Sequence, residues 1–300
     1  MWSKILGHDK QVAQLKKVLS GGQIPHAFLF CGPEGIGKRK TAVGLAQALN
    51  CEARTGIPCE DCLACQKIEK NIHPDCLLIE PEGKAIKIDT LREMKQKACL
   101  HPLEGRSKVF LIDPAEAMTT AGANALLKIL EEPPAETFFI LITSKASLLL
   151  PTIRSRCRRF DFQPLSGEIL QKILSAAGFA KTEADLRTAL SQGSAARALS
   201  WDLNLFEKAK ACWEKLEAGP APSLLFQFSE ACAEEEEQLP FILGAFGHLA
   251  HQKLMAAEAQ SEIERRARQW QAVGQALHLL DTYANKRLLV ENLLFTLQAA

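Results

Sequence analysis

Residues 26–39 have the sequence HAFLFCGPEGIGKR. The first six residues are apolar and are stopped by Gly32-Pro33, a pattern that predicts a short buried strand. Glycines then recur up to Lys38, and a helical pattern follows from Lys40 to Leu49. A glycine-rich turn between a strand and a helix N-terminus lets backbone amides and a lysine surround a phosphate group. The stretch therefore predicts a phosphate-binding loop (P-loop), with Gly32, Gly35, Gly37 and Lys38 as its binding residues.

Short apolar runs alternate with helical patterns through the first half of the chain. Further strands are predicted at Cys76–Glu80, Val109–Asp113, Phe138–Thr143 and Arg159–Phe162. Helical spacing of apolar residues is found at 11–19, 90–100 and 121–132. This alternation predicts an α/β fold, with a mostly parallel sheet covered by helices on both faces.

The strand signals stop after Leu165, and the remainder to Ala300 has helical patterns. Glycine or proline breaks occur at Gly178, at Gly193 and in the stretch 219–222. Apolar helices of a bundle are predicted at 206–216, 224–232, 239–257, 267–284 and 288–297. We therefore predict three domains: an α/β domain at 1–164, a small helical domain at 165–205 and an all-α domain at 206–300.

Composition places the chain among ordinary globular proteins. It is 47% hydrophobic and 24% charged, which argues against a disordered or disulfide-scaffold protein. Its 36 basic and 35 acidic residues give a formal charge of +1, so it has no overall electrostatic signature of a nucleic-acid binder. Because no apolar run of about 18 residues is present, we expect no membrane association and a cytoplasmic location, where cysteines stay reduced.

Four of the ten cysteines are clustered between the P-loop helix and the second predicted strand. They are Cys51, Cys59, Cys62 and Cys65. Four thiolates at this spacing can close a tetrahedral shell around zinc, and a full shell leaves no position for a reactive water. The pattern predicts a structural zinc site. Nearby acidic residues favour a stabilising or protein-binding role over nucleic-acid binding.

The predicted nucleotide site departs from the pattern of an active ATPase. Arg39 stands where a Ser or Thr hydroxyl normally binds magnesium, and an arginine carries the same sign of charge as the metal. Asp113 ends its strand as the expected acid near the metal, but Pro114 follows it where a glutamate would activate water. Glu116 is the nearest other carboxylate. We therefore expect that ATP and magnesium are not bound productively.

Several motifs together resemble the AAA+ clamp-loader family of bacterial DNA polymerase III. They are the stretch from His26 to Pro33, the cysteine module at its position in the chain, Asn124–Pro134 (NALLKILEEPP) and Ser155-Arg156-Cys157. The match runs through about two hundred residues. In this family an intact P-loop marks the gamma/tau motor, whereas a degenerate P-loop beside a retained Ser-Arg-Cys triplet resembles the delta-prime type.

The resemblance implies an AAA+ sheet domain with a helical lid, followed by a collar domain that assembles a ring of five subunits. It also implies that Arg156 acts in trans, on the ATP of a neighbouring motor subunit. The resemblance matches Thr143-Ser144 to polar residues that sense the gamma-phosphate, and the alternative is that they only end a strand. In the segment 193–200, the place of the lid arginine falls on Ala196, and Arg197 follows one residue later, about 100° around a helix.

The sequence hypothesis is a clamp-loader subunit that does not hydrolyse ATP. Its expected partners are gamma/tau and delta subunits, the sliding clamp and, through the complex, primed DNA; its expected cofactor is structural zinc. Two alternatives stay open. One is an active gamma/tau-like ATPase that tolerates Arg39, and the other is a zinc-binding DNA or scaffold protein that uses the AAA+ fold for interaction alone.

Overall fold

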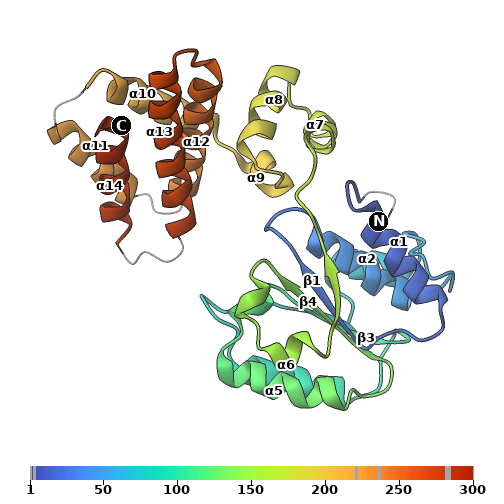
Figure 1. Ribbon diagram of the computed structural model, residues 1–300. Coiled ribbons are helices and arrows are strands. Elements are labelled where there is room, and N and C mark those ends of the chain that lie inside the picture. Colours follow the sequence, from blue (N-terminus) through green and yellow to red (C-terminus); the bar gives the residue numbers. More distant parts are fainter. Residues whose placement is uncertain (1, 3–4, 220–221, 235–237, 281–284, 300) are drawn as a thin grey trace. The chain divides into compact units, whose positions relative to one another are not determined.

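The computed structural model describes residues 2, 5–219, 222–234, 238–280 and 285–299. They form two compact units (Figure 1). The first comprises the chain up to residue 173 together with 193–196, and the second comprises 174–192 and 197–300. The finer division into three domains at 165 and 205 stays a prediction.

The first unit is built on one sheet of five parallel strands in the order β2-β3-β4-β1-β5. The strands are β1 (Ala27–Cys31), β2 (Cys76–Ile79), β3 (Lys108–Ile112), β4 (Thr137–Thr143) and β5 (Arg158–Asp161). All five predicted strands are therefore present, and their parallel arrangement is confirmed. Parallel strands end at the same edge of a sheet, so the residues that follow β1, β2, β3 and β4 are brought together there.

Helices cover both faces of this sheet, as the sequence predicts (Figure 1). Alternate residues of β1, from Ala27 to Cys31, pack with α4 (Ile88–Ala98), α5 (Thr120–Glu131) and α6 (Pro151–Arg154) in one hydrophobic core. Phe28 and Phe30 point to the other face, where Phe30 packs against the rings of Phe160 and Phe162. On that side lie α1 (Asp9–Ser20) and α2 (Lys38–Asn50). Each fully buried phenylalanine stabilises the fold by about 1.5–3 kcal/mol.

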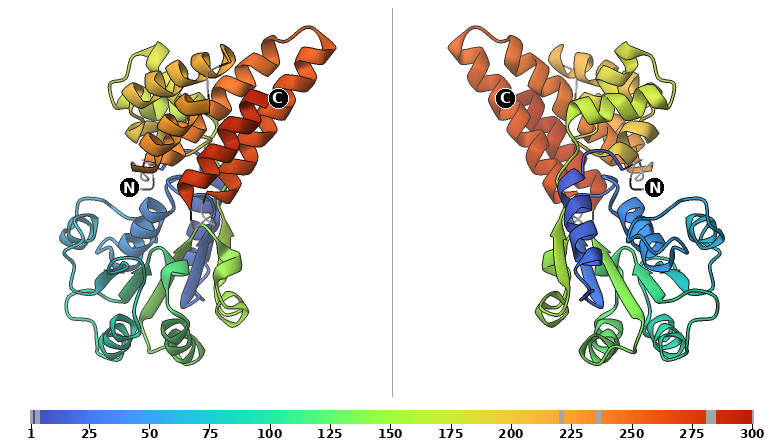
Figure 2. Two further views of the ribbon diagram at one scale, coloured as in Figure 1. Left: turned by 90° about the vertical axis from the view of Figure 1, so that its left-hand side faces the viewer. Right: turned by 90° about the vertical axis from the view of Figure 1, so that its right-hand side faces the viewer.

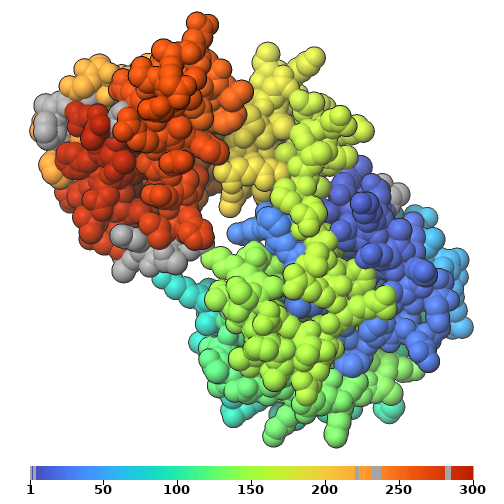
Figure 3. Space-filling model, in the orientation of Figure 1, coloured from blue at the N-terminus to red at the C-terminus, as the bar shows by residue number. Residues whose placement is uncertain are grey.

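A hydrogen bond connects the edge strand β5 to the N-terminal helix α1. Gln11 Nε2 donates a hydrogen bond to Asp161 O at 2.6 Å, and Figure 3 shows the α1 region (blue) beside the β5 region (yellow-green). The first unit also contains α3 (Leu63–Glu69) and most of α7 (Gly167–Ala176). Short 3₁₀ turns at Ala115–Ala117 and Ala146–Leu148 follow β3 and β4.

The second unit is a set of helices around an aromatic and leucine-rich core. Its helices are α8 (Lys181–Leu190), most of α9 (Ala195–Ser200), α10 (Leu203–Glu217), α11 (Pro222–Glu234), α12 (Leu239–Ala256), α13 (Gln260–Leu279) and α14 (Lys286–Ala299). α12, α13 and α14 run side by side (Figure 2), with Phe246, Val273 and Leu294 buried between them. The predicted bundle is confirmed.

The helix boundaries of the bundle differ from the prediction mainly at α13. This helix begins at Gln260, before its expected start at 267, because the polar first turns carry no apolar spacing to mark them. Its predicted end at 281–284 lies outside the described residues. No helix in the described parts of the chain is long and apolar enough to cross a membrane.

Asp75, just before β2, organises the loop that leads into β3. Its fully buried carboxylate accepts hydrogen bonds from the backbone N–H groups of Leu103, Glu104 and Gly105, each at 2.8 Å. Burial raises the pKa of Asp75, but these N–H groups outweigh burial, so the pKa lies below its ordinary value. The ionised carboxylate therefore holds the loop.

We predict that Asp75→Asn lowers the free energy of unfolding by about 1–3 kcal/mol at pH 7, because an amide cannot accept all three N–H groups. Since the folded-state pKa is depressed, this stabilisation is complete above the ordinary aspartate pKa of about 3.9 and is lost as pH falls through the folded-state value. Urea denaturation at several pH values measures it, with the exposed Asp89→Asn as control. A difference that grows toward acid pH would refute the role of this carboxylate.

Candidate functional site

The predicted P-loop joins β1 to α2 and can be made only with glycines at key positions. Gly32 and Gly35 have φ angles of 150° and 73°. A Cβ at Gly32 would lie 2.4 Å from Phe162 O, and one at Gly35 would lie 2.3 Å from Ser194 Oγ. Gly37, with φ at 105°, begins α2 in a left-handed conformation. The loop is thus packed closely against two other segments of the first unit.

The side chain of Lys38 points into this loop. Its Nζ donates hydrogen bonds to Gly32 O at 2.6 Å and to Pro33 O at 2.5 Å, and the residue is only 6% exposed. Burial lowers the pKa of Lys38, and the nearby carboxylates of Asp113 and Glu116 oppose that shift. The amine that is expected to meet phosphate here binds the carbonyl groups of its own loop.

Arg39 joins the carboxyl ends of two neighbouring strands. Its Nε lies 2.5 Å from Asp113 Oδ2, directly after β3, and its Nη2 lies 2.8 Å from Glu80 Oε1, directly after β2. Burial lowers the pKa of Arg39, but the hydrogen bond and charge of Asp113 outweigh it, so the pKa is raised. A fixed positive charge therefore sits on the carboxylate that the sequence assigns to magnesium.

Glu80 was not identified from the sequence. The available signal was the position of an acid at the end of Cys76–Glu80, matching Asp113 at the end of the next strand in the sheet. Acids that follow adjacent parallel strands meet at one edge.

Glu116 and Thr143 are engaged in contacts of the same edge. Glu116 Oε1 accepts hydrogen bonds from Ser144 N at 2.9 Å and from Ser144 Oγ at 2.6 Å. Burial raises the pKa of Glu116, but the hydrogen bond from Ser144 outweighs it and the pKa is lowered. Thr143 is 1% exposed, its carbonyl accepts Gly32 N at 3.2 Å, and its Oγ1 accepts Lys145 N at 3.1 Å. Glu116 therefore serves as a hydrogen-bond acceptor for the end of β4.

The segment 193–196 lies directly on the P-loop. Ala196 N donates to Gly35 O at 3.0 Å, and Leu165 N donates to Gly193 O at 2.9 Å. Within the second unit, Arg197 Nη1 lies 3.5 Å from Gln192 Oε1. A methyl group, at Ala196, therefore stands beside the loop at the position that the resemblance assigns to an arginine.

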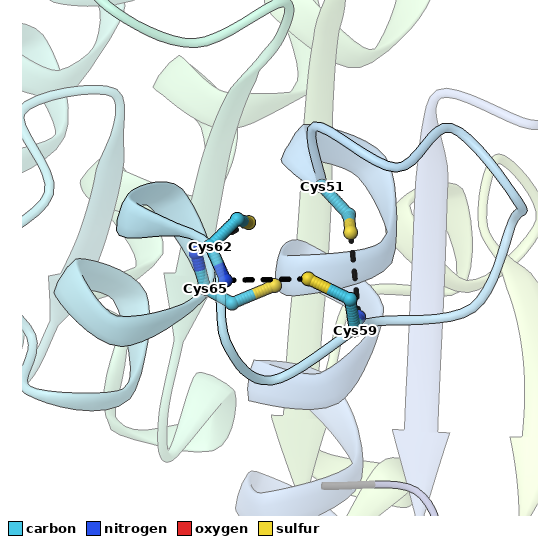
Figure 4. Close-up of side chains that lie close together, drawn as sticks. All are labelled: Cys51, Cys59, Cys62 and Cys65. Carbon is cyan, nitrogen blue, oxygen red and sulfur yellow. Dashed lines mark hydrogen bonds between the residues drawn. The ribbon is translucent and has the colours of Figure 1, made fainter.

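The four clustered cysteines come together in space (Figure 4). The Sγ atoms of Cys51, Cys59, Cys62 and Cys65 all lie within 4.8 Å of one another. Tetrahedral zinc, with Zn–S bonds of about 2.3 Å, places its sulfurs about 3.8 Å apart, so this donor set fits that metal. Bound there, zinc would act as a structural cross-link.

Backbone amides support the thiolate form of Cys59, whereas burial raises the pKa of Cys65. Cys59 N donates to Cys51 Sγ and Cys62 N donates to Cys59 Sγ, both at 3.3 Å. The N–H groups of Cys62 and Asp61 lower the pKa of Cys59 to about 7. Thiolate is the form that binds metal, so the local backbone favours ligation at Cys59.

Hydrogen bonds connect the cysteine module to the end of α2. Gln47 Nε2 donates to Cys65 O at 2.9 Å, and Arg106 Nη2 donates to Cys51 O at 3.0 Å. Cys51 and Cys65 are themselves fully buried. A metal in this module would therefore stabilise the packing of α2 and α3 together.

Arg156 lies between α6 and β5, and its side chain is 34% exposed. Its Nη1 donates to Thr152 O at 3.0 Å, and its Nη2 forms an ion pair with Glu131 Oε1 at 2.6 Å. Glu131 was not identified from the sequence, because the two residues are 25 positions apart and no local pattern links them.

Comparison with known protein families identifies the family of this chain. The family described as DNA polymerase III, delta subunit, matches residues 7–166, which is more than half of the 300-residue chain. The chain belongs to the clamp-loader family of DNA polymerase III. The predicted α/β fold of the AAA+ type is confirmed with it.

Relatives in this clamp-loader family carry two kinds of subunit name. The delta' subunit of Bacillus subtilis (strain 168) is 39% identical over 149 residues, covering 50% of this chain and 45% of the relative. The delta' subunit of Pseudomonas aeruginosa is 45% identical over 139 residues, covering 45% and 42%. The gamma/tau subunit of Mycobacterium tuberculosis (strain ATCC 25618 / H37Rv) is 37% identical over 176 residues, covering 58% and 30%. The chain therefore spans less than half the length of each of these relatives.

The solved structures that match the chain include a gamma subunit-related protein of DNA polymerase III from Thermotoga maritima. It is 21% identical with a TM-score of 0.45, covering 96% of this chain and 99% of that one. A RuvB structure from Thermotoga maritima is 16% identical with a TM-score of 0.45, covering 70% and 64%.

We predict that the first unit holds one zinc ion and loses stability without it. At free zinc 100-fold above its Kd, binding stabilises the fold by about 2.7 kcal/mol, which corresponds to about 5–10 °C in Tm for a unit of this size. The double variant Cys59→Ser with Cys62→Ser should lose both the metal, measured by mass spectrometry, and this increment of Tm. The control is Cys99→Ser, an exposed thiol outside the cluster. Equal Tm values for the two variants would contradict a structural metal.

Proposed function

We propose that this chain is a subunit of the DNA polymerase III clamp loader that does not hydrolyse ATP and that supplies Arg156 to ATP bound by a neighbouring subunit. The observation that carries the first half is the guanidinium of Arg39 on the carboxylates of Asp113 and Glu80. Magnesium at a P-loop needs a hydroxyl ligand after the lysine and an acid on the next strand. Here one residue removes the hydroxyl and neutralises the acid.

Two further features of the same edge support the loss of hydrolysis. Pro114 stands where a glutamate would activate water, and Glu116 is held by Ser144. At the lid position, Ala196 offers a methyl group instead of a charge for the phosphates. Three of the contacts that phosphoryl transfer uses are thus replaced, while the glycines that shape the loop remain.

The second half of the proposal rests on Arg156. A guanidinium carries five N–H donors, and two of them are used on Thr152 and Glu131, which leaves three for a phosphate oxygen. The side chain is one-third exposed, so a partner can reach it. An arginine supplied in trans stabilises the charge of the transition state and is worth roughly 10³–10⁵ in rate.

This function implies partners and a setting. The chain would assemble with gamma/tau and delta subunits in a ring and act with them on a sliding clamp and primed DNA, in the cytoplasm. The cysteine module would hold zinc for stability alone, because four thiolates leave no open ligand position. The overall charge of +1 agrees with DNA contact that is shared across a complex.

The first test separates this proposal from the alternative of an active ATPase motor. That alternative stays open because some relatives are named gamma/tau subunits. We predict that the purified chain hydrolyses ATP no faster than its Lys38→Ala variant does. Arg39→Thr should free Asp113 and add magnesium-dependent nucleotide binding, measured by calorimetry, yet still no turnover, because Pro114 supplies no base. Lys38-dependent hydrolysis by the unaltered chain would establish the motor instead.

The second test concerns Arg156. In a reconstituted ring, Arg156→Ala should lower ATP turnover by the neighbouring subunit at least about tenfold while the ring still assembles, since a trans arginine acts on the transition state. The control is Arg92→Ala, another exposed arginine with an intrachain carboxylate, Asp89. If ATP turnover with Arg156→Ala equals that with Arg92→Ala, the proposed trans role of Arg156 is refuted. Failure of the chain to co-purify with gamma/tau and delta would favour the scaffold alternative.

A further inference from the structure

Glu131 and Arg156 meet although they belong to different elements. Glu131 is the last residue of α5, and Arg156 follows α6. Their side chains form an ion pair at 2.6 Å, and α5 and α6 lie in contact on one face of the sheet (Figure 1). The pair is partly exposed, with 49% of the glutamate and 34% of the arginine side chain accessible.

The backbones on both sides of this pair are fixed by the core. Leu130 directly precedes Glu131 and is 1% exposed. Ile153, three residues before Arg156, and Cys157, directly after it, are 0% and 8% exposed. All three belong to the same hydrophobic cluster. The carbonyl of Leu130 is also bound by His26 Nε2 at 2.9 Å. The two side chains therefore leave rigid attachment points, and their meeting is a property of the packed fold.

We infer that Glu131 is the positioning residue of Arg156, an inference that rests on the proposed trans role of this arginine. Thr152 O and Glu131 Oε1 hold the guanidinium from two sides and leave three N–H donors for a phosphate oxygen of the neighbouring subunit. A long side chain that is already held loses less rotamer freedom when it meets its target. The essential property of Glu131 is its acceptor oxygen, which an amide also provides.

The chain offers a close control for this role. Glu132 is the next residue and is exposed; its backbone N–H donates to Lys128 O at 3.3 Å, and its side chain forms no hydrogen bond or ion pair with any residue that the structure describes. A substitution there changes the same local charge without touching the arginine.

The experiment measures steady-state ATP turnover by the neighbouring subunit in the reconstituted ring. Glu131→Ala should lower kcat about two- to tenfold with KM for ATP unchanged, which is the effect of freeing one long side chain. Glu131→Gln should restore kcat to within about twofold of the unaltered ring, since Oε1 still accepts the N–H. Glu132→Ala should match the unaltered ring. A merely structural role would instead alter ring assembly or Tm, which are measured alongside.

The outcomes separate this inference from the proposed function. If Arg156→Ala lowers turnover but Glu131→Ala does not, the trans arginine stands and its positioning by Glu131 is refuted. If Glu131→Gln lowers kcat as much as Glu131→Ala does, the charge of Glu131 matters rather than its acceptor oxygen, and the inference is also refuted. If Arg156→Ala itself has no effect, the proposed function fails and this inference fails with it.

Discussion

The contact of Arg39 with Asp113 and Glu80 determines how the rest of the first unit can be used. It joins the start of α2 to the carboxyl ends of β2 and β3, at the edge where parallel sheets place their ligands. Since Arg39 is about half exposed, the ion pairs add little to stability, and their main effect is electrostatic. A permanent guanidinium charge lies on the carboxylate of Asp113, the acid that the sequence assigns to magnesium. The loop keeps its shape, but the acid that would hold magnesium is already paired.

The surrounding structure agrees with a site kept for its architecture. Gly32 and Gly35 are required by close packing against Phe162 and Ser194, whether or not a phosphate is bound. Lys38 uses two of its three N–H donors within the loop, and Ala196 N donates a backbone hydrogen bond to Gly35 O. These contacts hold the sheet, the loop and the segment 193–196 together. Arg156 projects from a different part of the same scaffold, where its donors are not all used by its own chain.

The sequence predicted the features that depend on local pattern. Apolar runs located all five strands, the glycines located the loop, and the spacing from Cys51 to Cys65 located a cluster that the structure assembles. Partners that meet only through the fold were not predicted. Arg39 was expected to exclude a metal, but Glu80 as its second partner depends on strand order. Glu131 depends on the packing of α5 against α6, and the three N–H groups on Asp75 come from a loop about thirty residues away. Such contacts have no sequence period, so only the tertiary structure identifies them.

The central claim is that phosphate chemistry at this chain's own loop has been lost while the chain serves a neighbour. The most direct measurement is single-turnover ATP hydrolysis in rings where the P-loop lysines of all other subunits are substituted, so that Lys38 is the only one left. We predict no phosphate release above that of rings in which Lys38 is also changed to alanine. Release that depends on Lys38 would contradict the claim, because it would require magnesium and a reactive water at a site where Arg39 and Pro114 stand.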